Sequence, residues 1–285
     1  MGGGGDVTAR GPLARRAFST LGCPEAGVGD VVRLALAGGF GGVELRCAPG
    51  QLVTPETGPA EAAALADRFA GAGLEVVCLA SYVRVADEGP GVGADLERHL
   101  RLAARLRAPY VRVFGGDADH PRGRRDRAVR RLAAAAPAAE AAGVGLALET
   151  HDAFLTGAAV ADVLEAVGSP AVGAVWDAVN PWRAGERPAD TAESLRPWLR
   201  HTQFKDVASP TDLRPVLPGR GVLPLGEVTA ELRRLGYGGW VSLEWERAWY
   251  PDAAPLGDAL TAFTDTLDLL DPPGATDTRG APPRA

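Results

Sequence analysis

The chain has 285 residues, of which 46% are hydrophobic and 23% are charged, and its net charge at pH 7 is -6. This composition is typical of a globular enzyme, and the acidic balance argues against a protein that binds the phosphate backbone of nucleic acids. The three cysteines, Cys23, Cys47 and Cys78, are odd in number and lack the spacing of a metal site. No apolar signal segment follows Met1, and Pro137 interrupts the longest alanine-rich stretch, so we expect a cytoplasmic protein without a membrane span.

Short apolar runs alternate along the chain with amphipathic segments. Residues 1–14 and 272–285 are rich in glycine or proline, which predicts disordered tails around one domain at 15–271. In chain order, strands are predicted at 17–22, 42–46, 74–80, 110–115, 145–151, 173–178, 201–207 and 240–246. Helices are predicted at 28–39, 59–73, 93–108, 125–143, 158–168, 191–199 and 225–236, because apolar residues recur there every three or four positions.

This alternation predicts the fold class. Eight β–α units of roughly 30 residues favour a single (β/α)8 TIM barrel of the α/β class. A doubly wound sheet is the competing fold, but it would need a G-x-G-x-x-G motif after the first strand. The segment FSTLGCPEAG, residues 18–27, lacks that motif.

Polar residues gather at the ends of the last four predicted strands. In such barrels the active site lies at the C-terminal ends of the strands, and alternate residues share the inward face. The residues placed there are Glu149, His151, Asp177, His201, Gln203, Lys205, Ser242, Glu244 and Glu246. Three acidic groups at one rim would repel each other without a cation, which indicates a hard divalent metal held by oxygen ligands.

Lys205 is the only lysine in the chain, since 29 of the 30 basic residues are arginine. A compact ammonium retained at one position predicts a role that a guanidinium cannot fill. The alternative is an ordinary surface ion pair.

Seven segments carry a family resemblance: FSTLGCP, GGFGGVELR, LETHD, VWDAVNPWRAGE, HTQFKD, PGRGVLPL and GYGGWVSLEWE. From about residue 17 to 265 the chain resembles the xylose isomerase-like TIM-barrel superfamily, which includes sugar phosphate isomerases and epimerases and barrels of the AP endonuclease family 2 type. The resemblance implies Mn²⁺ or a similar ion, with Mg²⁺, Co²⁺ and Zn²⁺ as alternatives. Glu149, Asp177 and Glu244 match the family's acidic ligands.

The fourth ligand departs from the family pattern. The family motif is commonly H-x-K-D, whereas this chain reads QFKD, so Gln203 stands where a histidine is expected. A glutamine carbonyl can bind a hard cation, and we predict Gln203 as the fourth ligand. His201 lies two residues earlier and therefore deeper in the barrel, which predicts a hydrogen-bonded core residue. Asn180 also differs from the histidine that relatives often carry.

The resemblance implies a metal-dependent isomerase or epimerase that acts on a keto-sugar, sugar phosphate or cyclitol through an enediolate. Glu149 and Glu244 would move the proton, and Lys205, with a lowered pKa, would hold or protonate an oxygen. The predicted substrate-binding residues are His151, Arg214, Trp182 and Glu246, each weighed against a structural role. The expected partner is a small polyol or keto-sugar, with no nucleic acid and no membrane, and the resemblance also allows a homo-oligomer.

Three other functions compete with this prediction. A dehydratase of a keto-cyclitol or dehydroshikimate-like substrate would use the same site. A phosphodiesterase resembling endonuclease IV needs a histidine-rich metal cluster, and the chain has only four histidines. A non-catalytic sugar-binding barrel is the third. A buried ion pair of Glu44 with Arg46 or Arg112 is a further structural expectation.

Overall fold

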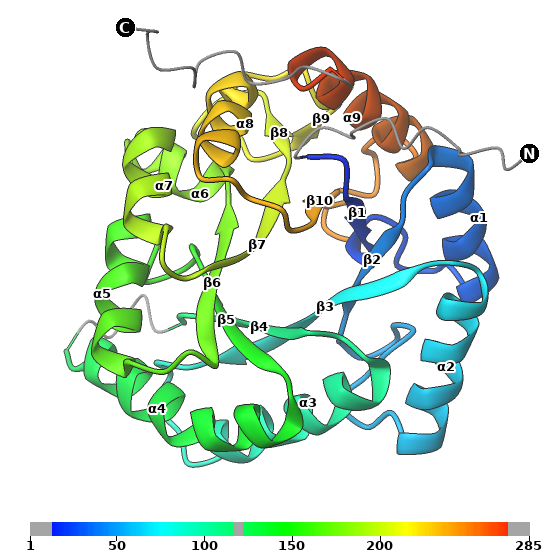
Figure 1. Ribbon diagram of the computed structural model, residues 1–285. Helices are drawn as coiled ribbons and strands as arrows, with labels where there is room; N and C mark the ends of the chain where they lie inside the picture. The colour runs from blue at the N-terminus through cyan, green and yellow to red at the C-terminus, as the bar shows by residue number, and fades with distance from the viewer. Residues whose placement is uncertain (1–12, 117–121, 273–285) are drawn as a thin grey trace, which may run out of the picture.

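The computed structural model describes residues 13–116 and 122–272, and it confirms the predicted barrel. Eight parallel strands close in the order β1-β10-β7-β6-β5-β4-β3-β2, and the helices surround them (Figure 1). The strands are β1 Arg16–Ser19, β2 Gly42–Arg46, β3 Glu75–Arg84, β4 Tyr110–Phe114, β5 Gly145–Glu149, β6 Val172–Asp177, β7 Leu199–Phe204 and β10 Val241–Leu243.

The predicted helices form with small changes at their ends. They are α1 Val28–Gly38, α2 Pro59–Gly71, α3 Val92–Leu106, α4 Arg124–Ala142, α5 Gly157–Val167, α7 Pro188–Leu195 and α8 Leu225–Arg234. Gly39 adopts a left-handed backbone, with φ 72°, and thereby ends α1. The Thr156 hydroxyl accepts a hydrogen bond from the Ala159 amide and caps the start of α5.

Several elements were not predicted. They are the 3-10 turn η1 Thr20–Gly22, the short helix α6 Val179–Arg183, the antiparallel pair β8 Asp206–Val207 and β9 Pro215–Val216, and the last helix α9 Leu256–Leu270. The first strand is shorter than predicted because the Ser19 hydroxyl accepts a hydrogen bond from the Leu21 amide and starts the 3-10 turn. In α9, Phe263 packs against Phe40 and Phe204 with ring centroids 6.4 and 5.9 Å apart. This helix therefore covers β7 and the end of α1.

The inside of the barrel changes from apolar to polar along the strands. Ala17, Val77 and Cys78 form a small apolar cluster of their own near the N-terminal ends. Farther along, the register pairs Gln203 with Asp177 on β6 and with Ser242 on β10. All three are fully buried, so neighbouring strands deliver polar groups to one level of the barrel.

The predicted tails lie almost wholly outside the described residues. Leu13, however, falls in the predicted tail at 1–14 and is buried in the core, with its amide donating to Asp271 Oδ2 at 3.1 Å. Leu13 is therefore part of the packed core. Among the helices of the described segments, none has the length and hydropathy that a bilayer-crossing helix needs.

Candidate functional site

Lys205 lies at the centre of a carboxylate cluster where β7 ends. Its ammonium Nζ is 2.9 Å from Asp177 Oδ2, 2.8 Å from Glu244 Oε2 and 2.6 Å from Glu246 Oε1. Asp177 ends β6 and the two glutamates follow β10, and these are the two strands beside β7 in the barrel. The ammonium donates hydrogen bonds to Glu244 Oε2 and Glu246 Oε1, and it forms an ion pair with Asp177.

Glu149 and Arg112 form a second buried pair in the same region. Glu149 ends β5, Arg112 lies in the middle of β4, and Arg112 Nε is 3.1 Å from Glu149 Oε2. Glu149 is 1% exposed and Arg112 is 3% exposed. The pair is an ion pair without a hydrogen bond: among the described residues, Arg112 Nε, Arg112 Nη1 and Glu149 Oε2 are all buried without a hydrogen-bond partner. A buried donor without a partner is unusual, and it is free to bind an oxygen atom of a substrate.

Glu44 was expected to form a buried ion pair with Arg46 or Arg112, but Arg112 pairs with Glu149. Glu44 Oε2 instead lies 2.7 Å from His201 Nε2, and Glu44 Oε1 accepts a hydrogen bond from Gln203 Nε2 at 2.9 Å. His201 and Glu44 are almost completely buried. His201 is therefore the hydrogen-bonded core residue that was predicted.

Asp177 is held from several sides. Its Oδ1 accepts a hydrogen bond from the Val179 amide at 2.9 Å, and its Oδ2 accepts one from Asn180 Nδ2 at 2.8 Å. Asn180 in turn accepts from Arg183 Nε. Asn180 thus fixes the orientation of the Asp177 carboxylate. The residues that make these hydrogen bonds, Val179, Asn180 and Arg183, all lie in α6.

Burial and charge set the pKa values of the cluster. Burial alone would lower the pKa of Lys205, but Asp177, Glu244 and Glu246 raise it well above its ordinary value. The predicted lowered pKa of Lys205 is therefore wrong, and this side chain stays charged. Burial raises the pKa of Glu149 to about 8, with Arg112 opposing the change. Burial also raises the pKa of Glu244, and Lys205 opposes that change.

Two of the predicted substrate-binding residues lie at the edge of the cluster. Glu246 contacts Lys205, and its side chain is 16% exposed. His151 is the more open residue, with 35% of its side chain exposed, and its Nδ1 lies 2.8 Å from Asp152 Oδ1. That carboxylate raises the pKa of His151 even though burial lowers it. The His151 ring also packs on Phe114, with centroids 4.5 Å apart.

The other two predicted substrate-binding residues lie apart from the cluster. Arg214 is on the β8–β9 connection, has 74% of its side chain exposed, and pairs with Asp212. Trp182 packs against the hydrophobic core from α6. Neither makes a contact with the carboxylates around Lys205 in the described structure, so neither supports a substrate-binding role.

The predicted metal ligands Glu149, Asp177, Gln203 and Glu244 do not fit a metal ion. Lys205 already bonds the oxygens of Asp177 and Glu244 that would have to bind the ion. Gln203 directs its amide nitrogen at Glu244 Oε1 over 3.2 Å, and its oxygen Oε1 is buried without a hydrogen-bond partner among the described residues. Glu149 pairs with Arg112. Across residues 13–116 and 122–272, no group of three His, Cys, Asp or Glu side chains is arranged to hold a metal.

A groove is lined by residues of β2, β3 and α3 and of the loops that follow β2 and β10, and none of the residues of the Lys205 cluster lines it. Its volume is about 460 Å³, and its lining includes Arg46, Tyr82, His99 and Trp249. The Arg46 guanidinium lies 4.6 Å from the Trp249 ring centroid, and its Nε donates to the Tyr82 hydroxyl at 2.8 Å. Tyr82 also lies 5.7 Å from the Arg112 guanidinium. Tyr82 therefore lines the groove and also lies near the Arg112 guanidinium.

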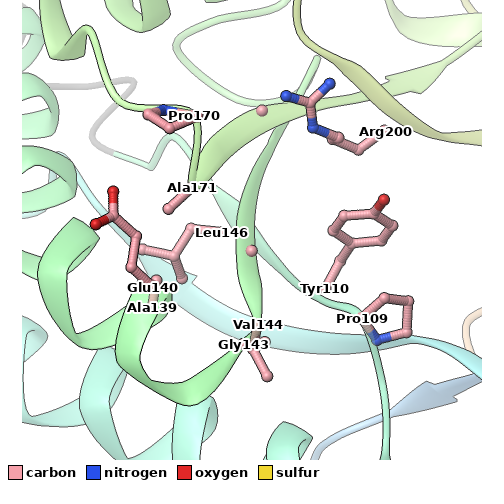
Figure 2. Close-up of a pocket in the computed structure, with 12 residues that line it drawn as sticks. Pro109, Tyr110, Ala139, Glu140, Gly143, Val144, Leu146, Pro170, Ala171 and Arg200 are labelled. Carbon is pink, nitrogen blue, oxygen red and sulfur yellow. The ribbon is translucent and has the colours of Figure 1, made fainter.

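A second cavity lies at the opposite end of the barrel. It is lined by residues at the starts of β4, β5 and β7, among them Tyr110, Leu146 and Arg200. Figure 2 shows Arg200 and Glu140 on opposite sides of this cavity. None of the predicted site residues lines it, because they all follow the C-terminal ends of the strands.

Two important contributions were not recognised in the sequence. Arg112 was considered only as a structural partner, although its alternation with Tyr110 and Phe114 places it inside the barrel. Asp206, in the QFKD motif, accepts hydrogen bonds from the amides of Gly219, Gly221 and Leu223 at 2.9 to 3.2 Å. Asp206 therefore folds the loop that follows Lys205. The sequence feature that could have identified Asp206 is an acidic residue directly after the only lysine of the chain.

Comparisons with known proteins agree with the barrel. A family model described as a xylose isomerase-like TIM barrel matches residues 32–266. A 3-dehydroshikimate dehydratase of Bacillus anthracis is 26% identical over 182 residues, which cover 54% of this chain and 64% of that protein. The chain thus aligns with less than two thirds of that relative's length.

Solved structures of several proteins are also similar. The probable 3-DHS dehydratase AsbF of Bacillus anthracis superimposes with a TM-score of 0.73 at 20% identity, over 89% of this chain and 98% of that one. D-psicose 3-epimerase of Clostridium cellulolyticum H10 gives 0.77 at 17% identity, over 90% and 99%. The IOLI protein, solved with a zinc atom, gives 0.76 at 16%, over 90% and 97%. At these identities the likeness shows the fold alone.

Proposed function

The chain belongs to the xylose isomerase-like TIM-barrel family, and we propose that it is an isomerase or epimerase of a keto-sugar, sugar phosphate or cyclitol. The proposed reaction removes a proton from the carbon next to a carbonyl group. The intermediate is an enediolate, and the proton returns to a neighbouring carbon or to the other face of the same carbon. The proposed partner is therefore a small hydroxylated substrate.

The observation that carries this proposal is the buried pair of Glu149 and Arg112. A base that removes a proton from carbon is effective when its pKa is close to the working pH. Burial raises the pKa of Glu149 to about 8, whereas an exposed glutamate would be a much weaker base. The unpartnered Nη1 of Arg112 lies beside this base and can donate to the substrate oxygen on which negative charge develops.

The other groups of the cluster supply charge and a second acid–base residue. Lys205 stays protonated, so it acts as a fixed positive charge that stabilises the enediolate oxygen. The raised pKa of Glu244 suits it to give a proton to the intermediate or to accept one from it. Glu149 and Glu244 then form the proton-moving pair. No step in this scheme uses a metal ion. Of the predicted ligands, Glu149 pairs with Arg112, and Asp177 and Glu244 pair with Lys205. The fourth, Gln203, donates hydrogen bonds to Glu44 and Glu244.

The groove that Arg46, Tyr82 and Trp249 line is the proposed place for the rest of the substrate. Tyr82 and Trp249 are 38% and 54% exposed, and aromatic rings of this kind pack against the apolar face of a polyol. The Arg46 guanidinium is held over both rings and can donate to a substrate hydroxyl, carboxylate or phosphate group. These residues would place the carbonyl end of a substrate near Arg112.

A dehydratase is the second candidate. It is favoured by the sequence similarity to a 3-dehydroshikimate dehydratase, which aligns over 54% of this chain. In that reaction Glu149 would take the proton from carbon, and an acid such as Glu244 would protonate the departing hydroxyl group, so that water leaves. Proton abstraction is common to both reactions, and they differ only in whether the neighbouring hydroxyl is lost.

Product analysis separates the two candidates. The purified full-length chain is incubated with D-fructose, D-psicose, D-tagatose, a keto-cyclitol and 3-dehydroshikimate, and the products are examined by mass spectrometry and NMR. An isomerase or epimerase gives a product of unchanged mass with a new NMR spectrum. A dehydratase gives a product that has lost one water. If no compound of this chemical class is changed by the wild type, the proposed function is contradicted.

A further inference from the structure

We infer that the ammonium group of Lys205 takes the place of a divalent cation in this site, so that the protein folds and works without a metal ion. The reaction that this site catalyses rests on the proposed function. The inference that an ammonium replaces the metal ion rests only on side-chain contacts. Those contacts concern Lys205, Gln203 and the acids around them.

The position of the ammonium is the first argument. Two of its three partners, Asp177 and Glu244, are acids that the sequence assigned to the metal. The nitrogen lies 2.6 to 2.9 Å from its three carboxylate oxygens. A cation that bound the same oxygens would have to displace Lys205 into a region where its charge is surrounded by protein, since Lys205 is 6% exposed.

Gln203 provides the second argument. Its amide nitrogen donates to Glu44 Oε1 and Glu244 Oε1 at 2.9 and 3.2 Å. A metal ligand at this position would have to turn an oxygen or nitrogen lone pair toward the cation. Turning the amide over would place its oxygen against two carboxylates and lose both hydrogen bonds. The Gln203 amide group therefore donates hydrogen bonds to two acids, as the Lys205 ammonium does.

The sequence provides the third argument. Lys205 is the only lysine, in a chain with 29 arginines. Three carboxylates arranged around one nitrogen match the compact ammonium group, whereas the planar guanidinium presents its donors as a fork. Lys205 matches the lysine of the H-x-K-D pattern, and the departure from that pattern is Gln203 in place of the histidine ligand. In this proposal the attached ammonium stands where a free cation would bind.

The test uses metal content and thermal stability, so its outcome does not depend on any substrate. Full-length wild type is purified without added metal and analysed by elemental mass spectrometry. Its Tm is then measured with EDTA and with added Mn²⁺ or Zn²⁺. We expect substoichiometric metal and a Tm that neither EDTA nor the added ions change. One bound ion per chain, together with a Tm that EDTA lowers, would overturn the inference.

Two variants examine the position of the cation. Lys205→Met removes the charge and leaves the acids in place, and Lys205→Met/Gln203→His also supplies an imidazole ligand. We expect each variant to gain a rise in Tm with Mn²⁺ or Zn²⁺ that the wild type lacks, because a ligand stabilises the state that binds it. If the double variant folds and takes up no metal, Lys205 does not occupy the position of a cation. Failure to convert sugars would contradict the proposed function and leave this inference standing.

Discussion

The ammonium of Lys205 lies 2.8 Å from Glu244 Oε2, and both side chains are buried where β7 and β10 end. Such a pair is costly to break from one side, since the remaining charge stays buried without a partner. Asp177 and Glu246 share the same ammonium, so the loss of Lys205 would leave three acids close together.

Lys205→Met should therefore destabilise the protein. Removal of one partner from a buried ion pair costs about 3–5 kcal/mol. Chemical denaturation at pH 7 without metal should show a loss of this order. Arg101→Met is the control, because the Arg101–Glu97 pair on α3 is exposed and should contribute little. Equal stability of the two variants would mean that the Lys205 cluster does not hold this end of the barrel together.

Lys205→Arg conserves the charge and tests the shape of the cation. We expect turnover to fall at least about tenfold, which is less than the roughly 100-fold that complete loss of a preorganised donor to a developing charge costs. The larger guanidinium also has to fit a buried site, which should cost about 1–3 kcal/mol of stability. Turnover equal to that of the wild type would show that the site needs only a positive charge.

The pH dependence follows from Glu149. Its pKa is raised from 4.5 to about 8, so the basic form accumulates as the pH rises and turnover should increase through this range. The folded chain keeps a proton between these values that the unfolded chain has released, so this group makes stability fall as the pH rises from 4.5 to about 8. Unfolding of the wild type and of Glu149→Gln, compared at several pH values, should show this difference. A constant difference would contradict the raised pKa.

Arg46→Gln tests the groove as the substrate site. Arg46 lies over Tyr82 and Trp249 on its wall, away from the proton-moving acids. We expect KM to rise by about tenfold, since loss of one charged hydrogen bond costs roughly 1.5 kcal/mol, with kcat and Tm nearly unchanged. Arg101→Gln serves as the exposed control. An unchanged KM would place the substrate elsewhere.

Much of the fold could be predicted from the sequence because the strand and helix periods are distinct. The segments at 42–46, 110–115 and 145–151 are close to β2, β4 and β5. The ends of other strands were less accurate, since they depend on local bonding such as the Ser19 hydroxyl that ends β1. The short helix α6 also depends on side-chain bonding around Asp177, which no periodicity reveals.

The site was predicted less completely. Alternation along β7 placed His201, Gln203 and Lys205 on one face, and the structure gives all three contacts inside the barrel. Alternation does not show how far a flexible side chain reaches. The four-carbon stem of Lys205 brings its ammonium among the acids, which the position of Lys205 along the strand does not reveal. That reach, together with the bonding of the Gln203 amide, decides which cation the acids hold.

The proposed function requires that Glu149 moves a proton at a carbon atom of the substrate. This is tested by deuterium incorporation from D₂O into recovered substrate and product, followed by NMR with the full-length wild type and Glu149→Gln. We expect one deuterium at the carbon next to the carbonyl with the wild type, and a rate at least about 100-fold lower with Glu149→Gln, as for removal of a catalytic base. Turnover without deuterium incorporation, or equal exchange by the folded Glu149→Gln variant, would contradict it.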